Sequence, residues 1–455
     1  MTHLDRAAMG ALILGAGLLA PPALAQGLLF EPGEDDRFSW ESYDAFAEAH
    51  DLSGETLTIL GPWTGADAAL AESVMAYFAA ATGAETLYNG TGNFENDVVV
   101  AVNGGSPPNL AVIAQPGLAA DLARGGFLTP MPEGTADWIR ENYAAGESWV
   151  DLATFPGPDG EEALYGLFYK VDVKSLVWYV PENFEEAGYE VPETMEDLKA
   201  LTETIVADGE TPWCIGLGSG EATGWPATDW VEDLMLRVNP PEVYDQWVTN
   251  AIPFDDPQVL AAIDEYGWFV RGEGFAAGGA SGSATSDFRD SPSGLFEFPP
   301  ECYLHKAATF IPTFFPEGVE VGEDADFFYF PAYEGEDLGQ PVLGAGTMFA
   351  ITEDSEAARA FVAFLQTPIA HEVWMAQSGF LTPFAEANAA VFPSDGERAL
   401  NDILTSATTF RFDGSDLMPG EIGTSAFWTA MVDYTVGAPA EEVAGAVQRR
   451  WDGLR

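Results

Sequence analysis

The sequence predicts an α/β protein with more than one lobe, and three features of the chain indicate this. Between residues 55 and 113, strand-like and helix-like runs alternate in the order β-α-β-α-β, which is typical of a parallel sheet covered by helices on both faces. The same style continues to the C-terminus with no internal repeat and no long linker. A chain of 455 residues suits two or three domains, or one large two-lobed domain. We therefore expect α/β lobes, and we expect the chain to cross from one lobe to the other more than once.

The elements follow from hydrophobic spacing and from helix start and stop signals. After a polar stretch over residues 31–51, we expect strands over 55–60, 84–88 and 110–113, with helices over 67–82 and 94–102 between them. Further on, we expect strands over 164–169, 175–179 and 213–217, and helices over 195–208, 228–238, 257–271, 355–365, 369–377, 425–436 and 441–451. Thr194 is the expected N-cap of the helix at 195. The small residues of 276–286 predict a flexible loop.

The N-terminus has the pattern of a signal peptide over residues 1–25. Arg6 precedes an apolar run from Ala7 to Ala20, and Ala23-Leu24-Ala25 has the small-x-small form of a cleavage site. Asp5 cancels the charge of Arg6, so the basic region is weak. The alternative is a short membrane anchor, but the run is shorter than the roughly 20 residues that a span needs. We therefore predict export to the periplasm.

The chain is strongly acidic, with 73 Asp+Glu against 17 Lys+Arg and a formal net charge of −56. This balance argues against nucleic acid as a partner, because phosphates need a basic footprint, and against docking on anionic lipid. Only four residues are lysines: Lys170, Lys174, Lys199 and Lys306. A carboxylate surface with little lysine stays soluble where salt screens self-repulsion, so we interpret the acidity as adaptation to saline surroundings. Attraction of a cationic ligand is the alternative.

Sequence signatures of enzymes and metal sites are missing. The chain has no P-loop, no G-x-G-x-x-G and no G-x-S-x-G motif. It also lacks H-E-x-x-H, Cys-x-x-Cys and EF-hand patterns, and His50, His305 and His371 lie far apart. We therefore predict no catalytic residues, no metal and no cofactor. A glycoside hydrolase stays open as an alternative, because its carboxylate pair has no fixed spacing in sequence.

Two cysteines, Cys214 and Cys302, follow the signal peptide. An even number of cysteines in an oxidising compartment favours a disulfide between them. The alternative is a pair of buried free thiols.

Aromatic residues stand in several loops beside small polar residues. Trp63 lies in GPWTG, Trp225 in GEATGWP, Tyr303 in PECY and Trp428 in TSAFW. Sugar rings stack on aromatic planes, and their hydroxyls need carboxylates and amides as partners. Core packing is the alternative for any one of these tryptophans, but the four loops together favour a sugar-binding cleft.

Several long blocks resemble the extracellular solute-binding proteins of carbohydrate ABC importers, the family of maltodextrin-binding protein. They cover residues 166–201, 211–230 and 418–454, and the blocks at 301–318 and 355–384 are most similar to the α-glucoside-binding subgroup. The resemblance covers nearly the whole mature chain in order. It implies a two-lobed periplasmic binding protein fold, with a ligand cleft between lobes that close by hinge motion.

The resemblance also implies the extent of each lobe. The N-lobe would hold residues 28–168 and 342–385, and the C-lobe 172–338 and 390–455. The chain would cross near 169–174 and 343–346, and a third time after Pro383.

Site residues are implied one at a time by the matching motifs. Trp428 matches a tryptophan that stacks on sugar. Glu221 matches a carboxylate that bonds sugar hydroxyls, and Trp225 matches the aromatic residue that stacks on sugar beside it. Their loop is one residue shorter than the loop of the family. Gln115 matches a polar residue at a strand end that faces the cleft.

Five further positions match more loosely. Trp63 and Thr64 match the loop after the first strand, and Glu95 the start of the next helix. Tyr303 stands roughly where the family has a tryptophan. Gly346 lies in a Gly-Ala-Gly-Thr motif that matches a strand end at a crossing, for which a plain tight turn is the alternative.

The function implied is binding of a carbohydrate for import, with the importer's membrane permease as partner and a monomeric binding protein. An α-glucoside such as maltose, trehalose or sucrose is the expected ligand. The alternatives are a secreted glycoside hydrolase and a binding protein for a polyol or glucosyl-polyol compatible solute. The recognised blocks leave no separate catalytic domain, which speaks against the hydrolase.

Overall fold

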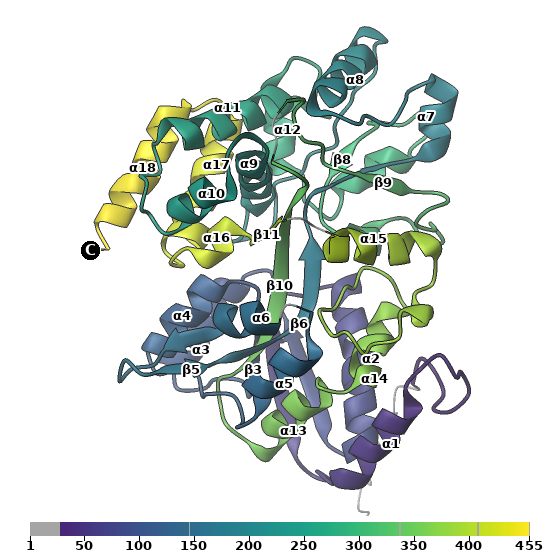
Figure 1. Cartoon of the computed structure of the whole chain (residues 1–455), viewed down its shortest axis with the longest axis vertical. Coiled ribbons are helices and arrows are strands. Elements are labelled where there is room, and N and C mark those ends of the chain that lie inside the picture. The colour runs from purple at the N-terminus through teal and green to yellow at the C-terminus, as the bar shows by residue number, and fades with distance from the viewer. Residues whose placement is uncertain (1–27, 145, 336–337, 407–408, 455) are drawn as a thin grey trace, which may run out of the picture.

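The chain folds into two α/β lobes, one above the other in Figure 1. The computed structural model describes residues 28–144, 146–335, 338–406 and 409–454, so the predicted signal peptide lies outside the described residues. The lower lobe is built on the larger sheet, and the upper lobe is mostly helical around a small sheet. The buried apolar side chains form two clusters: one fills the lower lobe and extends to Trp178, Leu295 and Ile311 of the upper lobe, and the other fills the helical part of the upper lobe.

The N-terminal part of the larger sheet has the predicted β-α-β-α-β order. β1 (Thr56–Gly61) pairs in parallel with β2 (Glu85–Gly90) and with β3 (Leu110–Ile113). Three helices follow these strands in turn: α2 (Ala66–Thr82), α3 (Phe94–Asn103) and α4 (Pro116–Arg124). The whole sheet is mixed rather than parallel, because β10 (Pro341–Ile351) runs antiparallel to β3.

Two long antiparallel strands carry the chain between the lobes. β6 (Gly166–Val173) rises beside β10 over the register from Gly166↔Ala350 to Val173↔Gly344. β6 then leads into β7 (Leu176–Tyr179), the central strand of the upper sheet, whose order is β8-β7-β9. The first half of β10 pairs with β11 (Thr409–Phe412), and its second half with β3. The chain crosses between the lobes a third time through β11, which leads it back to the upper lobe.

Gly344 and Gly346 lie inside β10, not at a strand end and not in a tight turn as the sequence suggested. Eleven consecutive buried residues form this strand. A side chain at Gly344 would collide with the Phe410 ring, and one at Gly346 would press on the Lys170 carbonyl. The glycines therefore allow β6, β10 and β11 to pack tightly where the chain crosses.

The upper lobe surrounds its small sheet with helices. Its elements are α7 (Pro181–Ala187), α8 (Met195–Ala207), α9 (Trp225–Val238), α10 (Pro241–Val248), α11 (Pro257–Arg271), α12 (Gly279–Thr285), η1 (Ser291–Phe296), β8 (His305–Lys306), η2 (Ile311–Phe314), β9 (Asp326–Tyr329), α16 (Gly414–Leu417), η4 (Ile422–Phe427), α17 (Trp428–Thr435) and α18 (Ala440–Asp452). Thr194 caps α8 as predicted, in a capping box with Asp197.

Further elements complete the lower lobe and its margin with the upper lobe. They are α1 (Trp40–Ala49), α5 (Thr135–Asn142), α6 (Gly146–Leu152), β4 (Thr154–Pro156), β5 (Glu162–Leu164), α13 (Glu356–Phe364), α14 (Pro368–Met375), η3 (Ala389–Val391) and α15 (Asp395–Ser406). Among the described residues, no helix has both the length and the apolar character that crossing a bilayer demands.

Two local predictions were wrong, and α1 is among the helices that were not predicted. Residues 276–286 contain the helix α12, because Ser283 is fully buried and its carbonyl accepts a hydrogen bond from the Leu217 N–H. Residues 213–217 form no strand, and Trp213 alone among them makes isolated bridges, to Ala276 on one side and to Leu304 on the other. The polar stretch at 31–51 contains α1, which buries Trp40, Tyr43 and Phe46. In each case tertiary packing overrides the local sequence signal.

Candidate functional site

A cavity of about 170 Å³ lies between the two lobes. The lower lobe contributes loops that follow β1 and β3, where the carboxyl ends of parallel strands meet. The crossing segments form its floor, and helix starts of the upper lobe form the opposite wall. Its lining includes Pro62, Trp63, Asp67, Thr91, Gly92, Phe94, Glu95, Ala114, Gln115, Lys170, Asp172, Lys174, Ser219, Ala222, Trp225, Phe288, Arg289, Phe310, Ala345, Gly346, Thr347, Asp413, Asp416 and Trp428.

Aromatic side chains from both lobes form much of the lining. Trp63 stands on the lower lobe, where its ring packs edge-on against Trp374 at 5.0 Å. Trp225 and Trp428 are the first residues of α9 and α17 on the upper lobe. Trp428 is 3% exposed, yet it belongs to neither apolar core cluster, so its burial comes from the cavity walls. Such a set of rings can stack on the apolar faces of a sugar.

Gly224 brings the two upper-lobe tryptophans to the same end of their helices. This residue precedes Trp225 at a φ of 114°, and a Cβ on it would lie 2.2 Å from the Trp428 carbonyl oxygen. Only glycine fits such a close approach at a positive φ. The starts of α9 and α17 therefore meet, and both indoles reach the cavity.

Several polar atoms in the lining are buried without a hydrogen-bond partner in the described part of the chain. They are Gln115 Oε1, Thr347 Oγ1, Trp428 Nε1 and Arg289 Nε. The Gln115 amide nitrogen is already used, because it donates to Glu95 Oε1 at 3.1 Å. Buried polar groups are normally satisfied, and an unpaired one costs about 1–3 kcal/mol. Both donors and acceptors are thus free to bond a ligand that carries hydroxyls.

A buried ion-pair network supports the floor of the cavity. Lys174 Nζ donates to Asp229 Oδ1 at 2.8 Å and to Asp413 Oδ2 at 2.5 Å. Burial opposes the charge on Lys174, but Asp229 and Asp413 raise its pKa well above the ordinary value. The carboxylates of Asp229, Glu232 and Asp413 converge within 4.8 Å, close enough for a metal ion. The Lys174 ammonium lies between two of them, so the chain supplies the positive charge itself.

Two carboxyl groups on the lower-lobe side of the cavity have a raised pKa. Burial raises the pKa of Asp67 to about 6, although Lys170 and Arg289 pull it downward. Burial also raises the pKa of Glu95, which receives the Gln115 hydrogen bond. Both can accept hydrogen bonds from ligand hydroxyls.

A second hollow, here called the groove, adjoins the cavity and has a volume of about 490 Å³. Glu95 and Trp428 line both spaces and therefore separate them. The remaining groove residues are Asn96, Val99, Asn103, Leu118, Asp121, Leu122, Phe127, Glu221, Gly420, Glu421, Thr424, Ser425 and Thr429.

Comparison with known proteins identifies the family. A model of the family "Bacterial extracellular solute-binding protein" matches residues 61–372, which is more than half of the chain. The chain belongs to this family. The α-glucosides-binding periplasmic protein AglE of Rhizobium meliloti (strain 1021) is 60% identical, over 98% of this chain and 97% of its own. The osmoprotective compounds-binding protein GgtB of Synechocystis is 41% identical, over 88% of this chain and 93% of its own.

Solved structures agree on the two-lobed fold. The bacterial solute receptor AcbH has a TM-score of 0.75 at 18% identity, over 88% of this chain and 100% of that chain. The maltose-bound MalE3 of T. maritima has a TM-score of 0.67 at 12% identity, over 88% of this chain and 100% of that chain. The predicted fold class, two α/β lobes with a cleft between them, is thereby confirmed.

The structure of this solute-binding protein places the nine predicted ligand residues as follows. Six of them line the cavity: Trp63, Glu95, Gln115, Trp225, Gly346 and Trp428. Glu221 lines the groove instead. Thr64 is absent from the lining of both spaces, and so is Tyr303, whose ring packs edge-on against Tyr189 at 5.2 Å. Their ligand-binding roles stay predictions.

Sequence reasoning missed the charged residues of the cavity. Lys170, Asp172, Lys174, Asp413 and Asp416 come from two crossing segments that are far apart in sequence. One signal was available, since two of the chain's four lysines stand in the apolar strand run around 166–175. Lysine is almost never fully buried unless it is paired, so lysines in a buried strand indicate a functional or structural ion pair.

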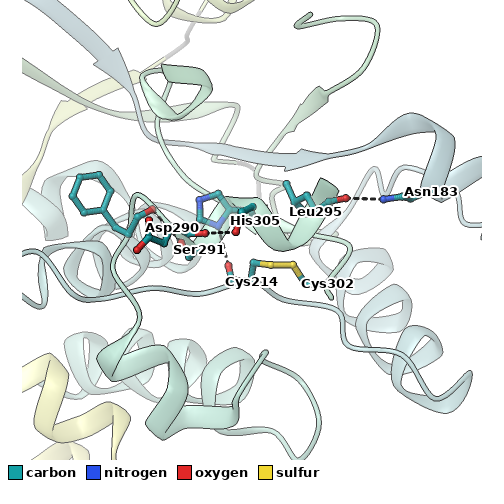
Figure 2. The surroundings of a disulfide bond; sticks show 9 residues. Asn183, Cys214, Asp290, Ser291, Leu295, Cys302 and His305 are labelled. Atoms are coloured by element: carbon teal, nitrogen blue, oxygen red, sulfur yellow. Dashed lines mark hydrogen bonds between the residues drawn. A yellow bond between two sulfur atoms is a disulfide. The ribbon is translucent and has the colours of Figure 1, made fainter. Parts of the chain in front are cut away.

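The predicted disulfide is confirmed, and Figure 2 shows its surroundings. Cys214 and Cys302 are bridged with their Cα atoms 5.5 Å apart. The bridge lies against η1, where a Cβ on Gly294 would come within 2.7 Å of the Cys214 sulfur. Phe288 and Arg289, which line the cavity, directly precede η1. The disulfide therefore braces the segment that carries this part of the cavity wall.

Proposed function

We propose that this solute-binding protein binds an α-glucoside in the periplasm and presents it to the membrane permease of a carbohydrate ABC importer. The single observation that carries the proposal is the cavity itself. Aromatic faces there lie beside buried, unpartnered donors and acceptors on Gln115, Thr347 and Trp428. The 60% identity to a protein named for α-glucosides supports the choice of sugar.

Ligand capture follows from the arrangement of the lobes. We take the lobes as residues 28–168 with 342–385 and residues 172–338 with 390–455, except that α15 lies at the margin between them, and β6 and β10 serve as the main connections. Bending at these connections opens and closes the cavity. The closed form buries the sugar between Trp63 below and Trp225 and Trp428 above. The protein acts as a monomer, without a cofactor and without a catalytic step, after removal of residues 1–25.

A second candidate ligand is a polyol or a glucosyl-polyol that serves as a compatible solute. The 41% identity to a protein named for osmoprotective compounds favours it, together with the net charge of −56, which suits saline surroundings. Both candidates present hydroxyls to the same cavity.

Calorimetric titration with maltose, trehalose, sucrose and α-glucosylglycerol tests the proposal. We expect one ligand per chain for at least one of these compounds, and no binding of the corresponding β-glucosides at the same concentration. Absence of binding for every α-glucoside would contradict the proposal. Prolonged incubation without release of reducing sugar excludes the glycoside hydrolase.

A further inference from the structure

One face of α9 buries four charged side chains. They are Asp229, Glu232, Asp233 and Arg237, of which Asp229 is 6% exposed and the others are fully buried. Their spacing of three and four residues places them along one side of the helix. Buried charges contribute little net stability compared with apolar side chains of similar size, because they first lose their hydration. These four side chains are here called the α9 charge row, and their partners include the segments that cross between the lobes (Figure 1).

The α9 charge row holds the first two crossing segments. Asp229 Oδ1 accepts a hydrogen bond from Lys174 Nζ at 2.8 Å. Asp233 Oδ1 accepts one from Ser175 Oγ, also at 2.8 Å. The same Ser175 oxygen accepts a hydrogen bond from the Leu343 N–H of β10 at 2.9 Å. Because Ser175 lies just after β6, one hydroxyl joins both long strands to α9.

The row also holds the start of β10 and the third crossing segment. Arg237 donates to the Pro341 carbonyl oxygen at 3.0 Å. Glu232 Oε1 accepts a hydrogen bond from the Ser415 N–H at 2.9 Å, shortly after the end of β11. All three crossing segments are thus fastened to one helix of the upper lobe.

Below these points, the same two long strands are fastened to the lower lobe. Tyr169 Oη donates to the Ala370 carbonyl oxygen at 2.5 Å. The Val171 N–H donates to the Leu381 carbonyl oxygen at 2.9 Å. On β10, residues 348–351 pair with β3 of the lower sheet. The lower lobe therefore holds β6 up to residue 171 and β10 from residue 348 onward.

The change to upper-lobe contacts follows at once on β6. Thr309 Oγ1, from the upper lobe, donates to Asp172 Oδ1 at 3.1 Å and accepts from the Val173 N–H at 3.2 Å. On β10, the Gly344 carbonyl oxygen accepts a hydrogen bond from the Asp413 N–H of the third crossing segment at 2.7 Å. The stretch between the two sets of contacts is therefore only a few residues long in each strand.

We propose that the α9 charge row fixes the axis of lobe closure, because it confines the bend to the link 171–172 of β6 and to residues 345–347 of β10. Ser175 and Asp233 act as positioning residues, since they lie outside the cavity lining and act through the strands that they hold. The pairing of β6 with β10 shifts register directly after Thr347, at the lower edge of the bend. The inference goes beyond the proposed function and relies on it only for the choice of ligand in the test.

The axis matters for binding because the cavity lies on it. Asp172 and residues 345–347 line the cavity. Trp225, the first residue of α9, has its ring centre 5.2 Å from Lys174 Nζ. Closure about a fixed axis brings Trp225 to one position opposite Trp63. If the bend spread along the strands, the two rings would meet over a range of positions, and a less preorganised site binds more weakly.

The width of the interlobe distance distribution tests the proposal on the mature protein. Spin labels at Glu141→Cys on α5 and Glu203→Cys on α8 occupy exposed positions of the lower and the upper lobe. Cys214 and Cys302 are bridged, so the labels react with the introduced thiols. Pulsed electron paramagnetic resonance then gives the distribution with and without trehalose.

Ser175→Ala removes the hydroxyl that joins both strands to Asp233, and Ser283→Ala is the matched control. Both serines are fully buried, but Ser283 Oγ bonds within α12, to the Gly279 carbonyl oxygen at 3.2 Å. We expect Ser175→Ala to broaden the distribution with and without trehalose, and to weaken trehalose binding by about three- to tenfold. Ser283→Ala should leave both the distribution and the affinity unchanged.

Hydrogen exchange of backbone amides in the unchanged protein gives a second measurement that needs no variant. We expect the amides of residues 173–175 and 341–343 to exchange at the same slow rate with and without trehalose, because they move with the upper lobe. The amides of residues 345–347 should exchange faster without trehalose and become protected when it binds.

A distribution as narrow for Ser175→Ala as for the parent protein, with only a lower melting temperature, would overturn the proposal, since the hydroxyl would then stabilise the fold alone. Exchange at residues 341–343 that depends on trehalose would overturn it as well. Failure of trehalose to bind would count against the proposed ligand instead. The distribution without trehalose would still decide whether Ser175 fixes the axis.

Discussion

Three of the four lysines are buried, and each is paired with carboxylates. Lys170 bonds to Asp172, Lys174 to two aspartates, and Lys306 to Asp233 at 3.1 Å. Lys199 is the most exposed of the four, with 26% of its side chain exposed. The acidic surface inferred from composition is therefore even poorer in lysine than the residue counts indicate. Lys170 and Lys174 neutralise Asp172 and Asp413 in the cavity lining, where an unpaired buried charge would be costly.

Trp428 and Phe427 are neighbours in sequence with opposite environments. Phe427 is fully buried in the upper-lobe core, against Trp247 and Phe254, whereas Trp428 lines the cavity. We expect Trp428→Ala to weaken binding of the best α-glucoside by about 1–3 kcal/mol, or about 5- to 150-fold, since it removes stacking and a free donor. We expect Phe427→Ala to lower the free energy of unfolding by about 3–5 kcal/mol.

A thermal melt and a titration of each variant separate the two roles. If Trp428→Ala lowers the melting temperature sharply while the folded fraction binds with the original affinity, then Trp428 is a core residue. The stacking surface would then have to be sought at Trp63 and Trp225.

At the scale of elements, helices with strong local sequence signals were predicted correctly, whereas features that depend on tertiary packing were not. α11 follows from its spacing because it has an N-cap in Asp256 and a regular apolar face over Val259, Ile263 and Tyr266. α12 could not be predicted, since its small residues are helical only through packing against neighbouring elements. The interior position of Gly344 and Gly346 depends on three strands that meet from distant parts of the chain.

The residues of the candidate site likewise fall into a predicted group and a group that was missed. Motif resemblance located the aromatic residues and Gln115, which lie next to strand ends and helix starts. It did not locate Arg289 or Asp416, whose neighbouring sequence carries no motif and which reach the cavity only through the fold.

The disulfide between Cys214 and Cys302 is expected to stabilise the upper lobe. It closes a loop of 88 residues, so the chain-entropy argument gives a stabilisation of about 4–5 kcal/mol as an upper value. We expect Cys214→Ala/Cys302→Ala to lower the free energy of unfolding by about 2–5 kcal/mol in urea denaturation. A variant as stable as the parent protein would show that the bridge contributes nothing, and two free thiols in periplasmic protein by mass spectrometry would show that it does not form.

At the scale of the whole molecule, buried carboxyl groups set the pH dependence of stability. Burial raises the pKa of Asp67 to about 6 and that of Asp229 to about 7, and it also raises the pKa values of Glu232 and Asp416 well above their ordinary values. A carboxyl group whose folded pKa is raised takes up its proton earlier in the folded state than in the unfolded chain. Its contribution to stability is therefore present at low pH and is lost as the pH rises through the folded pKa.

Two buried histidines act in the opposite direction. Burial lowers the pKa of His305 and that of His371 to about 4, so their contribution is present above pH 6.5 and is lost as the pH falls toward 4. Burial also raises the pKa of Glu95 and that of Glu397, so six of the described carboxyl groups oppose the two histidines, and we expect the melting temperature in 1 M NaCl to rise from pH 7.5 to pH 5.5. Asp67→Asn should reduce that rise. A steady fall in melting temperature over the same interval would contradict this balance.

The net charge of −56 predicts that salt stabilises the protein. The Debye length falls from about 30 Å at 0.01 M to about 3 Å at 1 M salt, so self-repulsion of the surface carboxylates is screened over this range. We expect the melting temperature to increase with NaCl, and by a similar amount with KCl. Melting temperatures that stay flat would show that the repulsion has no net effect on folding.

The most direct test of the central claim is a crystal structure of the mature protein with trehalose bound. The account predicts a pyranose ring between Trp63, Trp225 and Trp428, with hydrogen bonds to Gln115 Oε1 and Trp428 Nε1. A sugar bound elsewhere on the protein, or one in the cavity that leaves those two atoms unpartnered, would contradict it.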